Sequence, residues 1–422
     1  CYICLNGQME RKWQSPEDSV ECLKNFSLYS EYFKQNISQD AYIYWQNVIK
    51  LCPWFSKSIY VNGVTILTNL INNEKDPSRK EKLIDTLFQT LEKRIEYFGE
   101  RGYVTGLIGI YLLTYKPAET RLAYIKLLES VDLEGKKTTP YVLSSLLYAV
   151  SSLLDKKMIE RATALSNLLK ATEIAYLNKD DEKNREAYQN ALTNLSKFIA
   201  QKFKCDEIEK EINDNLTSYN GNVPDYKVDV FLTILNEAGC TKSETFYNLA
   251  EQSYNRRPTY ESAISLAKIL LEKKDYSKAI KYLEDALQMS QQDTQKKVST
   301  LITLASVYEN IANYPKAREY AEKAIELDKN SYTAYIIIAN SYSRAKGCGD
   351  NECTNRANYW VATDVLYQAK KLFPDKEKEI NSLIQNYSYY YPKKEECFFY
   401  GIKEGDEVEV KCWINKKTKA RF

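Results

Sequence analysis

Residues 260–289 read YESAISLAKILLEKKDYSKAIKYLEDALQM, and residues 298–327 read VSTLITLASVYENIANYPKAREYAEKAIEL. Each segment contains two runs in which apolar residues recur every three or four positions, the spacing of amphipathic helices. A short polar stretch separates the two runs in both segments, and such a stretch predicts a turn. The sequence therefore predicts two consecutive helical hairpins of the same design.

Small and large residues follow the same order in both hairpins. Small residues are expected where two helices approach most closely, and large residues where space remains between hairpins. The first hairpin carries this order as Leu266-Ala267, Leu270, Tyr276, Ala279, Leu283 and Ala286. The second carries it as Leu304-Ala305, Tyr308, Tyr314, Ala317 and Ala324. A third begins with Tyr335, Ile338-Ala339 and Tyr342, and it resumes after an insertion with Ala362, Ala369 and Pro374.

This order resembles the tetratricopeptide repeat, a helical hairpin of about 34 residues that stacks into a solenoid. The resemblance implies an all-α fold, an α-solenoid of antiparallel helical hairpins, whose usual role is to bind other proteins. A similar unit is predicted near the N-terminus, with Leu28, Tyr32, Ala41, Trp45 and Pro53 at matching offsets. Between these regions the helical periodicity continues while the repeat pattern weakens, so we expect a degenerate array there.

The chain is expected to have five parts, each with its own sequence character. They are a signal-peptide remnant (1–7), an N-terminal region with the first repeat-like unit (8–55), a degenerate array of helical hairpins (56–254), a tetratricopeptide domain (255–391) with a disulfide-bearing insertion (343–357), and a small β tail (392–422).

The composition argues against most catalytic classes. Histidine is absent from the 422 residues, which excludes Ser-His-Asp chemistry and His-ligated zinc. No P-loop or Gly-rich dinucleotide loop occurs. Lys+Arg (59) nearly cancel Asp+Glu (57), so the net charge of +2 gives little long-range attraction for nucleic acid. We predict no catalytic residues, no cofactor, no metal site and no nucleic-acid partner.

The N-terminal seven residues, CYICLNG, are apolar and lead into a polar segment. We interpret them as the end of a secretion signal cut near Gly7 and Gln8, and the alternative is an arbitrary start of the chain. The apolar stretch Thr105–Thr114 is too short to span a bilayer and contains Gly106 and Gly109. It predicts a buried helix.

Eight further cysteines are expected to form disulfides because they stand at the ends of predicted helices and turns. Their order along the chain predicts four local pairs: Cys22 with Cys52, Cys205 with Cys240, Cys348 with Cys353, and Cys397 with Cys412. The alternative is a set of buried reduced thiols. Zinc at Cys348 and Cys353 is disfavoured because no further thiolate or histidine accompanies them. Disulfides indicate an oxidising compartment and agree with export.

Two segments suggest a closer resemblance. They are CGDNECTNRANYWVATD at residues 348–364 and YPKKEECFFYGIKEGDEVEVKCWIN at residues 391–415. Both are similar to segments of exported tetratricopeptide proteins of Bacteroidetes-type bacteria. This resemblance implies a periplasmic or outer-membrane-associated location and no defined activity.

The tail from Cys397 to Phe422 has a different pattern from the helices before it. The runs FFYG and EVEVKCWI, followed by a polar turn, predict two or three short strands. Such a small sheet is marginal alone, so we expect it to pack on the last helix as a cap of the solenoid. A separate binding module is the alternative.

The first helix of each tetratricopeptide hairpin lines the concave face of the array. On that face we expect a polar groove, the groove face, formed by Lys268, Glu272, Ser306, Asn310, Asn340 and Arg344. Such side chains can bind the backbone or carboxylate of an extended peptide. The carboxylate clamp of cytosolic co-chaperones is disfavoured because its lysine position holds Ile264.

Three functions remain open from the sequence. The leading hypothesis is an exported scaffold that binds proteins in the cell envelope, as part of an outer-membrane or secretion assembly. The second is a cytosolic co-chaperone-like adaptor. The third, a carbohydrate-active helical toroid, would need paired carboxylates brought together in space. The oligomeric state is not determined by the sequence.

Overall fold

The computed structural model describes residues 15–219, 221–290 and 293–422, and they form two compact units, one ending at Cys240 and one beginning at Thr241. Both units consist of consecutive helices joined by short turns, which confirms the predicted α-solenoid class. The expected signal remnant at residues 1–7 lies outside the described residues. The second unit begins before the expected boundary at residues 254 and 255. None of the described helices combines the length and apolar character needed to cross a bilayer.

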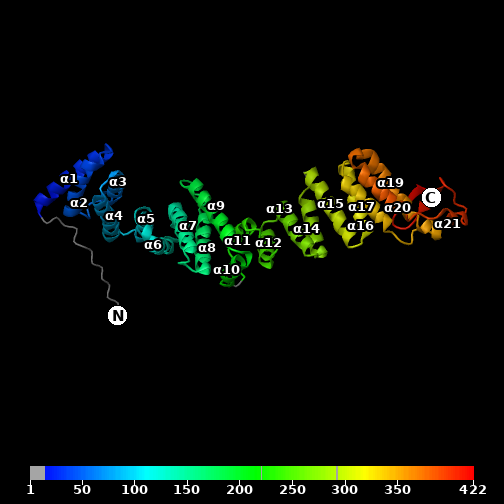
Figure 1. Ribbon diagram of the computed structural model, residues 1–422, viewed down its shortest axis with the longest axis horizontal. Coiled ribbons are helices and arrows are strands. Elements are labelled where there is room, and N and C mark those ends of the chain that lie inside the picture. Colours follow the sequence, from blue (N-terminus) through cyan, green and yellow to red (C-terminus); the bar gives the residue numbers. More distant parts are fainter. Residues whose placement is uncertain (1–14, 220, 291–292) are drawn as a thin grey trace. The chain divides into compact units, whose positions relative to one another are not determined.

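The first unit contains the helices labelled α1 to α11 in Figure 1, and most of them pack against the next helix along the chain. They are α1 (Pro16–Lys34), α2 (Ser38–Leu51), α3 (Ser58–Asn73), α4 (Pro77–Phe98), α5 (Arg101–Tyr115), α6 (Thr120–Glu134), α7 (Pro140–Asp155), α8 (Arg161–Leu177), α9 (Arg185–Lys202), α10 (Cys205–Thr217) and α11 (Asp225–Glu237).

Local sequence signals set the ends of these helices. Ser15 accepts a hydrogen bond from the backbone N–H of Asp18 at 3.1 Å, and Pro16 occupies the first helical position of α1. Asp76 caps α4 in the same way, with Pro77 following it. Gly99 ends α4 with φ of 72°, a left-handed conformation that glycine adopts without steric cost.

A buried tryptophan organises the first three helices. The Trp45 indole N–H donates to the carbonyl of Ile59 at 2.7 Å, which ties α2 to the first turn of α3. Gly63 lies beneath the ring, where a Cβ would stand 2.6 Å from the indole atoms. The Cys22–Cys52 disulfide joins α1 to the end of α2, as expected from the sequence. A closed loop of this size stabilises the fold by about 3–4 kcal/mol in the chain-entropy model.

Helix α5 confirms the buried helix predicted around Thr105–Thr114, and its glycines explain how it packs. Gly102, Gly106 and Gly109 recur along one face, and each faces a side chain of a neighbouring helix. A Cβ at Gly106 would lie 2.6 Å from Ser130 Oγ in α6 and 2.7 Å from Val142 Cγ2 in α7. The glycines therefore allow α5 to approach α6 and α7 more closely than side chains would permit.

An ion pair ties α8 to α10 near the end of this unit. The Arg161 guanidinium donates to Glu207 Oε1 at 2.6 Å and Oε2 at 2.8 Å. These hydrogen bonds lower the pKa of the Glu207 carboxyl to about 2. The Cys205–Cys240 disulfide is also paired as expected. It joins the start of α10 to Cys240, which lies shortly after the end of α11.

We expect the stability of this unit to fall in acid partly through Glu207. Because the folded pKa is depressed, the stabilisation is fully present above the unfolded value of about 4.3 and is lost as pH falls from there towards 2. The pair is partly exposed, so the gain is about 1 kcal/mol after solvent screening. Urea unfolding of the parent and of Glu207→Gln should differ at pH 6 and converge near pH 2. A difference in the free energy of unfolding that does not change with pH would contradict this prediction. The control is Glu237→Gln, which removes the charge of an exposed carboxylate.

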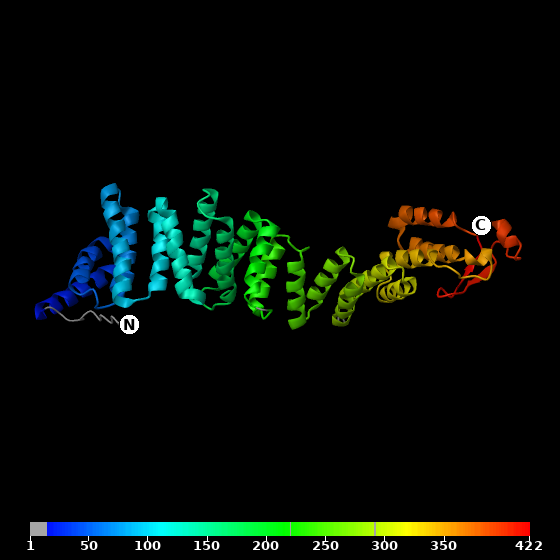
Figure 2. The ribbon, with the colours of Figure 1, turned by 90° about the horizontal axis from the view of Figure 1, so that it is seen from below.

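The second unit contains helices α12 to α21 and a two-stranded sheet, seen from a second direction in Figure 2. Its elements are α12 (Glu244–Arg256), α13 (Tyr260–Glu272), α14 (Tyr276–Met289), α15 (Thr294–Asn310), α16 (Tyr314–Leu327), α17 (Tyr332–Ser343), α18 (Glu352–Asn355), α19 (Asn358–Leu372), α20 (Glu377–Ser388), α21 (Lys394–Phe398), β1 (Glu407–Val410) and β2 (Lys416–Lys419).

The repeat pattern is visible in both packing and turns. The small residues Ala267, Ala279 and Ala286 are buried at the contacts between helices, as the sequence predicts. The turn from α13 to α14 and the turn from α15 to α16 each contain one left-handed residue, Lys274 and Ala312. Two successive hairpins therefore share the geometry of their turns as well as their core.

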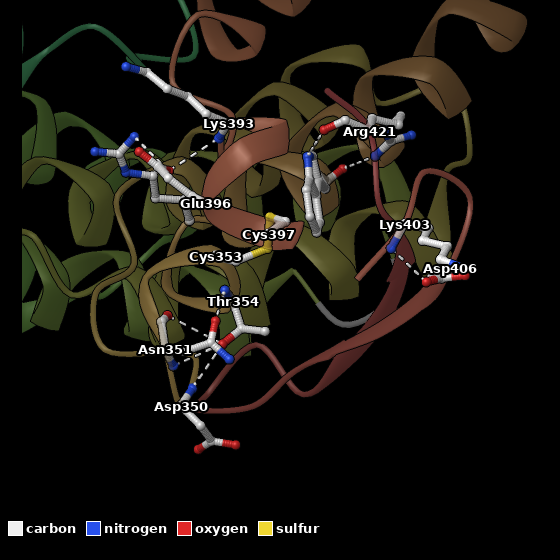
Figure 3. Close-up of a disulfide and its surroundings, with 12 residues drawn as sticks. Asp350, Asn351, Cys353, Thr354, Lys393, Glu396, Cys397, Lys403, Asp406 and Arg421 are labelled. Atoms are coloured by element: carbon white, nitrogen blue, oxygen red, sulfur yellow. Dashed lines mark hydrogen bonds and ion pairs between the residues drawn. A yellow bond between two sulfur atoms is a disulfide. The ribbon is translucent and has the colours of Figure 1, made fainter. Parts of the chain in front are cut away.

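The predicted insertion separates α17 from α19 and folds into a turn followed by the short helix α18. Thr354 Oγ1 accepts from the backbone N–H of Asp350, and Asn351 caps the helix (Figure 3). Gly349 permits this close turn, since its Cβ would stand 2.2 Å from the backbone of Thr354.

Two predicted disulfides of the second unit are wrong. Cys348 pairs with Cys412 and not with Cys353, and Cys353 pairs with Cys397. Both bonds join the insertion to the C-terminal segment, and Figure 3 shows the second of them between α18 and α21. The partners lie 64 and 44 residues apart. Loops of this length give about 4 kcal/mol each in the chain-entropy model, against about 2 kcal/mol for the predicted six-residue loop.

The C-terminal tail is only partly the β structure that the sequence predicts. Residues FF of the expected first strand belong to α21 and the turn after it, and the sheet is a hairpin in which Glu407 pairs with Lys419 and Val410 with Lys416. The hairpin packs on α19, not on the last long helix α20. The expectation of a sheet packed on the last helix is therefore wrong.

Candidate functional site

The groove face is built from equivalent positions of three first helices, α13, α15 and α17. In each helix two adjacent core residues precede the first groove position, as Leu266 and Ala267 precede Lys268. Helical periodicity then brings a second groove residue to the same side one turn later. We therefore expect the six predicted side chains to form two rows, one of Lys268, Ser306 and Asn340 and one of Glu272, Asn310 and Arg344, the last of which caps the end of α17.

Three groove-face residues are available for a partner. Lys268 and Asn310 are exposed, and Ser306 is half-buried. Their side chains make no hydrogen bond or ion pair with any residue that the structure describes. Polar side chains in this state keep their full hydrogen-bonding capacity for a ligand.

Glu272 is exposed and lies 3.3 Å from the ammonium of Lys242. Both side chains of this pair are well exposed, so the interaction contributes little to stability. A ligand can replace this ion pair with its own contacts to Glu272 at a small cost in free energy.

Asn340 has a different role from the one predicted for it. Its amide donates to Glu309 Oε1 at 3.0 Å, and its carbonyl oxygen accepts from the Tyr387 hydroxyl at 2.5 Å. Tyr387 belongs to α20, so Asn340 joins α17 to the helix that follows the last repeat. Its hydrogen-bonding capacity is largely used inside the chain.

The carboxyl of Glu309 lies near this face and has a shifted pKa. Burial raises its pKa, while the hydrogen bond from Asn340 and the nearby charge of Arg344 act in the opposite direction. Arg344 itself is exposed. Tyr359 stacks on Tyr390 with ring centroids 5.3 Å apart, which adds an aromatic wall beside Tyr387. The groove face therefore ends in a rigid polar and aromatic cluster at α17 and α20.

A second surface, the tail-docking face, consists of Arg318, Tyr342, Trp360 and Asp364, and the sequence does not predict it. Arg318 in α16 donates to the carbonyls of Trp413 and Ile414 at 2.8 Å and 3.0 Å. Arg421 donates to Asp364 in α19 at 2.6 Å. These contacts connect positions far apart in the chain, and no short motif signals them.

A group of metal-ligating residue types also requires comment. The sulfurs of Cys205 and Cys240 and a carboxylate oxygen of Glu209 lie within 4.8 Å of one another. The two cysteines are joined to each other as a disulfide, so neither sulfur is a thiolate that could bind a metal. This group gives no reason to infer a metal site.

The fold defines a helical-repeat protein. Residues 247–330, which include α13 to α16, match the family model described as Tetratricopeptide repeat. This segment of the chain therefore consists of tetratricopeptide repeats, as the sequence predicts. The family match does not extend to the first unit.

Solved structures with helical repeats are similar to this chain. The TPR domain of P58(IPK) is 12% identical, with 88% of this chain and 98% of that one covered and a TM-score of 0.26. Yeast Tom70 is 12% identical, with 90% and 94% covered and a TM-score of 0.25. Pseudomonas aeruginosa pilF is 12% identical, with 75% and 96% covered and a TM-score of 0.23. The chain matches no curated protein.

Proposed function

We propose that this chain is an exported scaffold that binds a partner protein through the groove face, and that it works in the cell envelope as part of an outer-membrane or secretion assembly. The observation that carries the binding proposal is a set of three polar side chains of the groove face, Lys268, Ser306 and Asn310. Lys268 and Ser306 stand at equivalent positions of consecutive hairpins, Asn310 lies one turn after Ser306, and none of the three has a partner among the described residues. An extended peptide can satisfy them one after another along the array.

Four disulfides support the proposal of export. Cytosolic thiols are normally kept reduced, whereas proteins of oxidising compartments form and retain disulfides. The bonds join helix to helix at Cys22–Cys52 and Cys205–Cys240, and insertion to tail at the other two. Thiol titration of natively produced protein should find these eight cysteines oxidised. Eight free thiols in a cytosolic fraction would favour the cytosolic adaptor.

A crosslinked pull-down from the native envelope fraction tests the groove face. The variant Lys268→Glu/Asn310→Ala reverses one charge and removes one amide, and it should reduce capture of specific partners by about tenfold. Asn340 is left unchanged because its loss would also disturb α20.

The matched control is Lys281→Glu/Gln288→Ala, which makes the same kind of change at exposed positions of the second helix α14. Its capture should equal that of the parent. Equal capture by both variants would show that the partner binds outside the groove face. Capture of no reproducible partner would contradict the scaffold proposal.

A further inference from the structure

The C-terminal hairpin covers an aromatic part of the second unit. The Trp413 ring lies 5.7 Å from the ring of Tyr342, and Phe422 lies 6.0 Å from Trp360. Trp360 is fully buried, and its indole N–H donates to the carbonyl of Arg421 at 2.7 Å. The tail-docking face therefore holds aromatic side chains that are shielded by the hairpin.

Polar contacts near its edges hold the hairpin, together with its buried apolar side chains Val408, Val410, Ile414 and Ala420. Asp364 accepts from Thr418 and from Arg421, and Arg318 donates to two hairpin carbonyls. The Asp364–Arg421 pair is partly exposed on both sides. Such contacts keep the hairpin docked while a disulfide holds it nearby, because the disulfide gives the hairpin a high effective concentration at its docking site. Without that disulfide the same contacts hold the hairpin weakly.

The two disulfides at this end of the chain differ in environment. Cys353 and Cys397 are both fully buried, and their bond joins α18 to α21 (Figure 3). Cys412 is exposed, and its backbone is left-handed with φ of 52°. A non-glycine residue in that region carries backbone strain.

We propose that Cys348–Cys412 is a redox-labile latch on the C-terminal hairpin, while Cys353–Cys397 is a permanent tether. A thiolate of a small dithiol attacks the exposed sulfur of Cys412 and forms a mixed disulfide, and Cys348 leaves as a thiolate. The second thiol of the reductant then displaces Cys412. The dithiol is oxidised to its own disulfide, and the two cysteines receive the two electrons and two protons.

The consequence is local and reversible. Cys353–Cys397 still fixes α21 to the insertion, so residues after Phe398 are released while the helical repeats keep their packing. The hairpin then exchanges between docked and free positions. In the free position it uncovers the rings of Tyr342 and Trp360, which the docked hairpin covers.

A redox titration of the native full-length chain tests the latch. The protein is equilibrated in buffers of reduced and oxidised dithiothreitol, alkylated and mapped by mass spectrometry. We expect Cys348–Cys412 to open at about tenfold lower reductant ratio than the other three bonds, because Cys412 combines exposure with a left-handed backbone, whereas Cys205, which is likewise not buried, has no such backbone. Opening of Cys353–Cys397 first, or of all four bonds together, would overturn the proposal.

Limited trypsin digestion then tests the release of the hairpin. Cleavage after Lys411, Lys416 and Lys417 should rise about tenfold when only Cys348–Cys412 is open, with helix content unchanged, because proteolysis follows the population of the open form. The variant Cys348→Ser/Cys412→Ser should show this cleavage without reductant, and Cys353→Ser/Cys397→Ser should not. Unchanged cleavage of native protein after selective reduction would overturn the latch.

Discussion

Replacing Glu173 with alanine is expected to lower the free energy of unfolding of the first unit by about 3–5 kcal/mol, because it leaves a buried ammonium without its counter-charge. The Lys227 side chain is only 6% exposed and that of Glu173 only 13%. The ammonium donates to Glu173 Oε1 at 2.5 Å and to Asn215 Oδ1 at 2.9 Å. Without the carboxylate, the remaining partners of Lys227 are one amide and the rings of Tyr219 and Phe231.

Two control variants separate this effect from simple loss of a surface charge. Asp214→Ala removes a carboxylate from an ion pair with Lys210 in which both side chains are more than half exposed, and it should cost under about 0.5 kcal/mol. The double variant Glu173→Leu/Lys227→Met removes both buried charges and should unfold close to the parent. Urea unfolding followed by circular dichroism measures all three. A loss for Glu173→Ala no larger than for Asp214→Ala would contradict the buried pair.

Replacing Gly106 with leucine is the second change with a large expected effect. Leucine favours helices more than glycine does by about 1 kcal/mol, so propensity alone predicts a gain. The contacts of α5 predict the opposite. No space exists even for a Cβ between Ser130 and Val142, so the variant should lose about 3 kcal/mol or more through displaced helices.

The control for Gly106→Leu is Thr114→Leu, which adds the same side chain at an exposed position of α5. We expect this control to stay within about 0.5 kcal/mol of the parent. Urea unfolding compares the two variants. If Gly106→Leu is as stable as the parent, then α5 does not pack against α6 and α7 as described.

The sequence predicts those parts of the molecule in which local pattern and packing agree. The order of small and large residues around Ala267 and Ala305 encodes each hairpin separately, and the turns repeat with it. The Cys22–Cys52 and Cys205–Cys240 disulfides follow from the same hairpin geometry. The first unit loses the repeat signature where glycine, as in α5, replaces alanine at the closest helix contacts.

The remaining features depend on contacts between distant segments. Nearness in sequence favours Cys348 with Cys353, yet the insertion folds so that each cysteine meets the tail instead. Asn340 stands at a groove position of its repeat, but its role is set by Tyr387 on α20. The docking of Arg421 on Asp364 has no local signal at all. Periodicity identifies which face a residue occupies, and it does not identify a partner from outside the repeat.

Binding of a partner protein at the groove face is tested most directly by site-specific photo-crosslinking in the native envelope fraction. A photoreactive phenylalanine analogue is placed at Ser306 in the centre of the groove face, and at Gln288 on α14 as the control. Crosslinking of a discrete protein from Ser306 and not from Gln288 is the result that we predict. Equal crosslinking from both positions, or crosslinking from Gln288 alone, would contradict the claim.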